Sequence, residues 1–199
     1  MQIDQLIFDE KNQDFFINDS IQKKERAQLA LVFGSRDLLK KPDWFKYIKS
    51  KYPCAQIASC STEDVVCSNK IYEKRLSITA ISFESTTVKT ACTNLSSFST
   101  IEEAGSFLVT KLLQDDLVHI LVLSDGKLIN GSELIRGMNQ EAPPGLIITG
   151  GLASDGAEHF ETLIGLNHTP TTGTVLAVGF YGTNLSIGYG SKEIGRAHV

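Results

Sequence analysis

The stretch Leu29-Ala-Leu-Val-Phe-Gly-Ser35 decides the fold class of this 199-residue chain. Its five consecutive apolar residues are followed at once by a Gly-Ser pair, a pattern typical of a buried strand that runs into a loop. Leu117 to Leu123 repeats this pattern and ends in Ser124-Asp125-Gly126. A strand that is apolar on both sides needs cover on both faces, so the two stretches indicate a chain of strands and covering helices.

Helix signals alternate with these strand signals. Pro42-Asp43 opens an amphipathic segment that Pro53 stops, Ser99-x-x-Glu102 forms a predicted capping box, and Ser132 is the predicted cap of a helix that ends before Pro143. Further strands are predicted at residues 56–59, 76–83, 88–92, 146–149, 163–166, 174–181 and 185–189. We expect 76–83 and 88–92 to form a β-hairpin, and the last three strands to form an antiparallel meander.

The two halves of the chain repeat each other. Leu31-Val32 matches Leu121-Val122 and Pro53 matches Pro143 at an offset of 90, and Phe83 then matches Phe180 at an offset of 97. The identities are few, so chance similarity between two α/β segments is the alternative, but strand, loop, helix and stop signals come in the same order in both halves. We therefore predict a mixed α+β fold built from a duplicated β-α-β plus antiparallel meander unit, with helices packed on mixed sheets.

The predicted domain covers residues 27–192, with the two units at about 27–95 and 117–191 and residues 1–26 as a lead-in segment. The run Ile194 to Val199 has no periodicity and matches the translation of a common sequencing adapter. We therefore expect residues 194–199 to be foreign to the protein, and the natural chain to continue beyond about Lys192.

Composition excludes several classes of protein. With 19 Lys+Arg, 23 Asp+Glu, a net charge of −4 and 42% hydrophobic residues, the chain has the balance of a globular domain and no basic cluster for nucleic acid or an anionic membrane. It contains no apolar run long enough to cross a bilayer and no secretory signal, so we expect a soluble, cytoplasmic protein. The four cysteines lack metal-site spacing, and we interpret them as thiols, most of them buried.

Four polar loops, each directly after a predicted buried strand, form the candidate ligand site. Ligands of open α/β sheets bind at the carboxyl ends of strands, and small residues there let a ligand approach backbone N–H groups. Exposed N–H groups and hydroxyls suit a carboxylate or carbonyl, so these loops could hold a small polar metabolite. Turn glycines and helix caps are the structural alternative for each residue. The candidate residues are Gly34, Ser35, Cys60, Ser61, Thr62, Ser124, Asp125, Gly150, Gly151, Asp155 and Gly156.

Motifs of the common enzyme classes are missing from the sequence. It contains no Walker A loop, no G-x-G-x-x-G after a strand, no G-x-S-x-G elbow and no H-E-x-x-H. Cys60 or Ser61 acting with Asp125 or Asp155 is the one enzymatic alternative, and a buried thiol is the competing interpretation of Cys60. No metal site is predicted.

Histidine is sparse in the chain. His119 lies in an apolar run, where a core position is the default interpretation, and His198 lies in the suspected adapter. His159 and His168 are the only candidates for an axial haem ligand, and each is more typical of a surface histidine.

Taken together, these loops resemble a known family. The runs Leu29 to Ser35, Ser59 to Thr62, Thr149 to Gly156 and Val175 to Gly182 are similar to the N-terminal half of the FIST domain, and Gly-Gly-Leu-Ala-x-Asp-Gly is the most specific of them. The family usually places small residues and glycine after the second loop, where this chain has Glu63-Asp64.

The resemblance implies a sensory domain of intracellular signal transduction that binds a small ligand, with amino acids as proposed ligands and haem-based nitric oxide sensing in some members. It also implies a C-terminal FIST half and, in some members, a signalling output domain as partners. Our leading hypothesis is therefore a non-catalytic sensor that binds an amino acid or a similar small polar metabolite without a cofactor. A haem sensor and an enzyme using Cys60 or Ser61 are the two alternatives.

Overall fold

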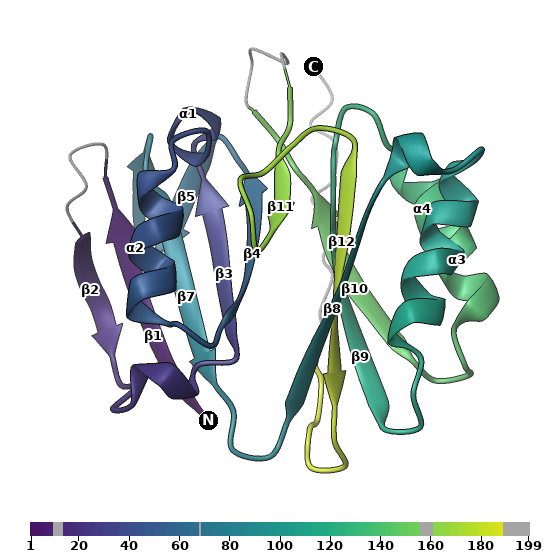
Figure 1. The fold of residues 1–199 in the computed structure, drawn as a ribbon, viewed down its shortest axis with the longest axis horizontal. Helices are drawn as coiled ribbons and strands as arrows, with labels where there is room; N and C mark the ends of the chain where they lie inside the picture. The colour runs from purple at the N-terminus through teal and green to yellow at the C-terminus, as the bar shows by residue number, and fades with distance from the viewer. Residues whose placement is uncertain (10–13, 68, 156–160, 189–199) are drawn as a thin grey trace, which may run out of the picture.

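A computed structural model describes residues 1–9, 14–67, 69–155 and 161–188, and within them two main sheets organise the fold (Figure 1). The six-stranded sheet has the order β11-β4-β3-β7-β1-β2, with β1 (Gln2–Phe8), β2 (Asp14–Asp19), β3 (Leu29–Gly34), β4 (Gln56–Ser61), β7 (Leu76–Ser82) and β11 (Ile164–Leu166). The four-stranded sheet has the order β10-β9-β12-β8, with β8 (Thr87–Asn94), β9 (Leu117–Ser124), β10 (Ile147–Leu152) and β12 (Thr174–Tyr181). A separate hairpin joins β5 (Asp64–Cys67) to β6 (Lys70–Glu73).

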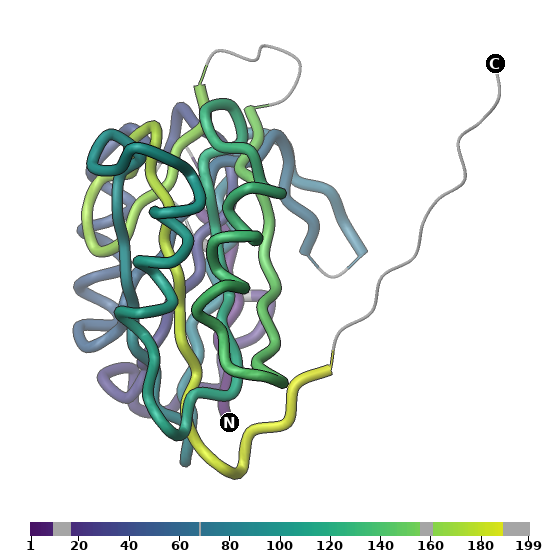
Figure 2. The backbone as a smooth tube through the Cα atoms, turned by 90° about the vertical axis from the view of Figure 1, so that its right-hand side faces the viewer, coloured from purple at the N-terminus to yellow at the C-terminus, as the bar shows by residue number. Residues whose placement is uncertain are grey.

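The helices cover the outer faces of the two sheets, so the molecule has four layers in the order helix, sheet, sheet, helix (Figures 1 and 2). Those of the six-stranded sheet are α1 (Arg36–Leu39) and α2 (Asp43–Lys51), and those of the four-stranded sheet are α3 (Ile101–Leu112) and α4 (Gly131–Glu141). Between the sheets, Leu29 and Cys60 of one pack with Leu123, Leu176 and Phe180 of the other. The apolar runs seen in the sequence therefore have cover on both faces.

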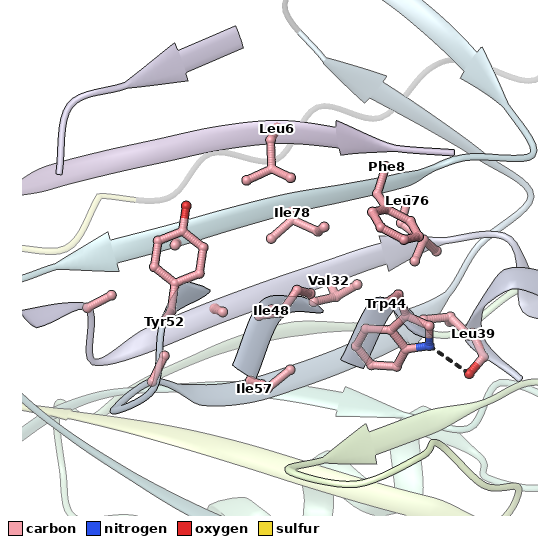
Figure 3. Packing of buried hydrophobic residues seen from close by; sticks show 14 of the residues in the cluster. Leu6, Phe8, Val32, Leu39, Trp44, Ile48, Tyr52, Ile57, Leu76 and Ile78 are labelled. Atoms are coloured by element: carbon pink, nitrogen blue, oxygen red, sulfur yellow. Dashed lines mark hydrogen bonds between the residues drawn. The ribbon is translucent and has the colours of Figure 1, made fainter. Parts of the chain in front are cut away.

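The outer core of the six-stranded sheet shows why α2 forms where it does. Trp44 and Ile48, one helical turn apart, are both buried and point at the sheet beside Val32 and Ile78 (Figure 3). The indole Nε1 of Trp44 donates a hydrogen bond of 2.9 Å to the carbonyl of Leu39, which satisfies its buried polar atom. Burial of this face, together with the predicted stop before Pro53, fixes the helix.

The duplication is visible in the sheet topology. In the six-stranded sheet, the parallel pair β4 and β3 is followed by β7 and then β1, each antiparallel to its neighbour. In the four-stranded sheet, the parallel pair β10 and β9 is followed in the same way by β12 and then β8. The first unit therefore begins with β1 and the second with β8. The predicted lead-in segment, residues 1–26, contains β1 and β2, two strands that the sequence reading missed.

The register of the sheets corrects one part of the predicted repeat. Leu31 lies opposite Thr79 in the first unit, and its counterpart Leu121 lies opposite Val178 in the second. Thr79 therefore corresponds to Val178, at an offset of 99 and not the 97 read from the sequence. Because side chains alternate every two residues along a strand, a two-residue error keeps every side chain on its correct face and leaves the apolar pattern unchanged.

The predicted hairpin of residues 76–83 and 88–92 is wrong. Both segments are strands, but β7 lies in one sheet and β8 in the other, and the turn between them carries the chain across. Phe83 at this crossing packs edge-on against Phe180, with ring centroids 5.9 Å apart, in the layer between the sheets. The alternation of apolar and polar residues and the turn residues between the strands are the same in a hairpin and in such a crossing, so the sequence does not distinguish them.

The predicted closing meander is also wrong. β11 pairs antiparallel with β4 in the six-stranded sheet, whereas β12 pairs with β8 and β9 in the other. Residues 185–188 contain no strand, and Tyr189 lies outside the described residues. Between β11 and β12, Thr171 forms an isolated antiparallel bridge with Ile164, where the chain turns. These two consecutive strands therefore belong to different sheets.

All three predicted helices are confirmed as α2, α3 and α4, with two caps shifted. Thr100 forms the capping box of α3 with Glu103, one residue after the predicted Ser99 and Glu102. The side chain of Asn130 caps α4 by accepting hydrogen bonds from the N–H groups of Ser132 and Glu133. The cap is therefore two residues before the predicted Ser132. α1 and the β5–β6 hairpin were missed, because four-residue elements leave too short a pattern.

In the described part of the chain, no helix is long and apolar enough to cross a membrane. All four cysteines are free thiols. Cys60 and Cys67 are buried, Cys92 is half-buried and Cys54 is exposed.

Candidate functional site

The loops that follow β3, β4, β9 and β10 meet at one end of the molecule (Figure 1). The backbone N–H of Ser154, after β10, donates to the carbonyl of Ser61 at the end of β4, over 3.0 Å. The N–H of Ala153 donates to the carbonyl of Ser124 at the end of β9, over 2.8 Å. The first of these hydrogen bonds joins strand ends from the two units, and the second joins two strand ends within the second unit, at the place where α/β sheets bind ligands.

A cavity of about 370 Å³ lies where three of these loops converge. Its walls come from the loop after β3, the turn between β4 and β5, the turn after β6, and the loop after β10. The lining residues are Ser35, Arg36, Asp37, Thr62, Glu63, Asp64, Glu73, Lys74 and Asp155. We call this the acidic cavity. Its volume lies within the range of small-molecule sites.

One ion pair crosses the acidic cavity from unit to unit. Arg36 Nη1 lies 3.3 Å from Asp155 Oδ2, and the two side chains are 15% and 4% exposed. The same Asp155 oxygen accepts a hydrogen bond of 3.0 Å from the N–H of Glu161, and the carboxylate of Glu161 pairs with Lys40 just beyond α1. Asp155 is therefore held between the first unit and the returning chain.

The charges of the acidic cavity favour one class of ligand. Its lining includes two cations, Arg36 and Lys74, and five acids, Asp37, Glu63, Asp64, Glu73 and Asp155. Such a surface attracts an ammonium group, and its guanidinium can hold a carboxylate through paired N–H donors. Glu63 and Asp64, which stand where the resembling family has small residues, are part of this wall.

Gly34 explains how the chain turns sharply into this cavity. Its φ is +150°, and a Cβ there would lie 2.0 Å from the carbonyl oxygen of Arg75 on the adjacent β7 side. That same carbonyl accepts the N–H of Ser35 over 3.1 Å, and the carbonyl of Gly34 accepts the N–H of Thr62. Glycine therefore brings Ser35 and Thr62, both predicted site residues, to the cavity wall.

Ser61 and Asp125 stabilise the loops and do not line the acidic cavity. Ser61 is fully buried, and its Oγ accepts from the N–H of Leu163 over 2.9 Å. Asp125, also fully buried, accepts from the N–H groups of Lys127, Leu128 and Gly173 and from Thr162 Oγ1, over 2.6–2.9 Å. Burial alone would raise the pKa of Asp125, but these hydrogen bonds outweigh it and hold the pKa below its ordinary value.

The thiol of Cys60 points into the apolar layer between the two sheets. The residue is 4% exposed, and burial raises the pKa of its thiol to about 12. A nucleophile needs an accessible thiolate, so the surroundings of Cys60 are those of a structural thiol. The aspartates proposed to act with it do not lie in this layer: Asp125 binds loop backbone and Asp155 pairs with Arg36.

The remaining predicted residues lie at a separate groove. Ser124, Gly150 and Gly151 line a groove of about 530 Å³ between β10 and the N-terminal half of α4, together with Leu134 and Leu152. The predicted ligand site is therefore divided between two places in the structure. Ser35, Thr62 and Asp155 lie at the acidic cavity, whereas Ser124, Gly150 and Gly151 lie at what we call the β10 groove. Gly156 lies outside the described residues.

Neither of the two described histidines lines the acidic cavity or the β10 groove, although His119 contacts Thr149 of the groove. His119 is buried, its Nε2 lies 3.2 Å from Thr149 Oγ1, and burial lowers its pKa. His168 is exposed, with Nδ1 2.7 Å from the carbonyl oxygen of Thr169, and His159 lies outside the described residues. Among the residues that the structure describes, no cluster of three or more His, Cys, Asp or Glu side chains could hold a metal ion.

Most of the charged wall was not predicted from the sequence. The cavity residues that are absent from the predicted site are Arg36, Asp37, Glu63, Asp64, Glu73 and Lys74. Glu73 and Lys74 reach the cavity only because the β5–β6 hairpin folds back, with Asp64 paired to Glu73. The one available signal was Glu63-Asp64, an acidic pair directly after a predicted ligand loop.

A comparison with curated proteins finds no match. The model of the FIST N domain matches residues 28–197, most of the chain, and its span runs from the start of β3 into the residues 194–199 that were suspected to be foreign. Those six residues lie outside the described structure. The chain therefore belongs to the FIST family, a family of sensory domains of signal transduction, and carries its FIST N domain.

Proposed function

We propose that this domain senses a small metabolite that carries an ammonium group, with amino acids as the first candidates, and binds it in the acidic cavity. The observation that carries the proposal is the wall of five acids and two cations built by loops from both units. An α-amino acid offers one ammonium and one carboxylate, which match the acids of the β4–β6 side and the guanidinium of Arg36.

Binding at this place has a structural consequence. A ligand carboxylate competes with Asp155 for Arg36, and Asp155 in turn holds the backbone of Glu161. Occupancy therefore changes the contact between the two units, and this change is the signal that the domain passes to a partner protein or an attached output domain. A sensor needs such a differential contact between its free and bound states.

Thermal unfolding with a panel of amino acids, simple amines and simple carboxylates tests the proposal. A ligand at about 100 times its Kd stabilises the folded state by about 2.7 kcal/mol, which shifts the unfolding midpoint measurably. We expect stabilisation by amino acids or amines and none by carboxylates that lack an amine.

The double variant Glu63→Gln, Asp64→Asn removes two charges from the wall and should weaken binding by about tenfold or more at low salt. Glu141→Gln on the exposed end of α4 is the matched control. A panel without any saturable stabilisation, or a double variant that binds as the control does, contradicts the proposal.

The alternatives have less support. His168, the one described haem-ligand candidate, is exposed and lines neither the acidic cavity nor the β10 groove. Cys60 and Ser61 are buried and hydrogen-bonded within the fold. The geometry therefore favours reversible binding of a polar ligand.

A further inference from the structure

The outer edge of β10 is the most exposed strand edge of the four-stranded sheet. β10 pairs in parallel with β9 on one side, and no described residue pairs with its other side. Gly150, Gly151 and Leu152 are exposed, and Leu152 is 51% exposed. Parallel strands are normally buried on both faces, so β10 is an unusual edge. Figure 2, which looks onto α3 and α4, shows it at the margin of the sheet.

The first unit shows what belongs at this position. β4 is the counterpart of β10, and its outer edge is covered by β11, which pairs antiparallel with Ala58, Ser59 and Cys60. The parallel partner strands β3 and β9 align β4 with β10. Phe33 of β3 lies opposite Cys60, and its counterpart in β9, Leu123, lies opposite Gly151. The covered residues 58–60 therefore correspond to residues 149–151, the centre of the exposed edge of β10. The duplicated fold thus predicts a short antiparallel strand against these three residues.

The composition of β10 also sets it apart from the other three edges. β2 carries Asp19, β8 carries Lys89, and β11 is only three residues long, and charge and shortness are the usual protections of an edge strand. β10 is Ile-Ile-Thr-Gly-Gly-Leu, and the groove beside it has eleven lining residues without a single charge. A surface of this kind meets an identical copy of itself without repulsion between like charges.

We infer that β10 pairs antiparallel with β10 of a second copy of this chain, around a two-fold axis near Thr149 to Gly151. The two four-stranded sheets then form one continuous sheet of eight strands. The exposed side chain of Leu152 and the apolar wall of the β10 groove become covered by the second copy, as both faces of parallel strands usually are. The interface is isologous, with the same strand on both sides.

Gly151 offers a clean test because a Cβ built there meets nothing within 4 Å and its backbone conformation is an ordinary one. Gly151→Lys therefore preserves the folded chain and places a charge at the two-fold axis. Ile17→Lys on β2, the edge strand of the other sheet, is the matched control. We expect sedimentation equilibrium of the full chain to show a reversible dimer, Gly151→Lys to raise its Kd about tenfold or more, and Ile17→Lys to leave it unchanged.

Circular dichroism checks that the variants are folded, and amide hydrogen exchange supplies a measurement that needs no variant. In the unmodified chain, exchange of residues 147–152 should slow as concentration rises through the dimer Kd, while exchange in β2 stays constant. A chain that stays monomeric at high concentration overturns the inference. So does a folded Gly151→Lys variant that dimerises as tightly as the unmodified chain, or exchange at β10 that does not depend on concentration.

Discussion

Arg36 and Asp155 join the two units of the fold through an ion pair of 3.3 Å at the wall of the acidic cavity. Arg36 begins α1 in the first unit, and Asp155 follows β10 in the second, 119 residues further along the chain. The pair is nearly buried, with both side chains less than one-sixth exposed. The contact between the units and the proposed ligand site therefore share the same two residues.

This sharing predicts that ligand binding and stability both respond to Arg36→Gln. The variant loses the guanidinium that would hold the carboxylate of the ligand. We therefore expect the apparent affinity for the amino acid, obtained from its stabilising effect in thermal unfolding, to fall about tenfold or more. The ligand-free protein should also lose about 3 kcal/mol or more, because the change leaves the nearly buried carboxylate of Asp155 without its cation. Lys41→Gln, an exposed neighbour, is the control. Unchanged ligand response in Arg36→Gln would assign the ligand to another place.

Asp125 should be among the most costly polar residues to change. Its carboxylate accepts four hydrogen bonds, and Asp125→Asn replaces an acceptor oxygen by an NH₂ group that faces other donors. We expect a loss of about 2–4 kcal/mol in urea unfolding at neutral pH. Asp115→Asn, at an exposed position, should change stability by less than about 0.5 kcal/mol. Equal stability of the two variants would contradict the anchoring role.

The same aspartate predicts a pH dependence. Because the pKa of Asp125 is lower in the folded than in the unfolded chain, its contribution to stability is fully present above the ordinary value of 3.8. That contribution is lost as pH falls below 3.8 through the lower pKa of the folded state. The difference in unfolding free energy between the unmodified chain and Asp125→Asn should therefore shrink toward acid pH. A difference that stays constant down to acid pH would refute this.

Cysteine labelling separates a structural from a reactive Cys60. With burial raising its pKa to about 12, Cys60 should stay unmodified by iodoacetamide at neutral pH in the native protein, while exposed Cys54 is labelled. Mass spectrometry of the digested protein gives both extents, and labelling in urea shows that Cys60 is reactive once exposed. Rapid native labelling of Cys60 would revive the nucleophile hypothesis.

The N-terminal strand should be required for folding although the family match begins at residue 28. β1 lies between β2 and β7, pairs with β7 along seven residues, and buries Leu6 fully. Leu6→Ala should therefore cost about 2–5 kcal/mol in urea unfolding. Leu113→Ala, at a side chain that is 46% exposed, is the comparison and should cost much less. A Leu6→Ala variant as stable as Leu113→Ala would show that β1 is dispensable.

Local sequence signals predicted the elements better than their partners. The runs around Leu31 and Leu121, the helix that buries Trp44, and the chain order of the two units follow from apolar periodicity and stop residues, which act over a few positions. The partner of β11 and the crossing from β7 to β8 depend on packing between segments far apart in the chain, and no local pattern encodes them. Hydrogen bonds such as that of Thr162 to Asp125 are equally non-local.

The candidate site was predicted at the level of loops, not of side chains. Ser35, Thr62 and Asp155 reach the acidic cavity because strand ends of β-α-β units converge, a rule that needs no knowledge of the partners. Ser61, Asp125 and Cys60 have the same local appearance but point into the fold, and one residue of alternation along a strand decides between the two outcomes. The charges of the β5–β6 hairpin were missed because its fold-back is set by tertiary contacts.

The placement of β11 also bears on the order in which the molecule assembles. Residues 164–166 complete the edge of a sheet whose other strands have all left the ribosome more than 80 residues earlier. Until Leu166 emerges, the growing chain carries β4 with its outer edge unpaired, and such an edge is prone to wrong pairing. During synthesis from the N-terminus, the edge of β4 therefore stays without its partner until residues 164–166 of the second unit are made, so completion of the first sheet depends on the second unit.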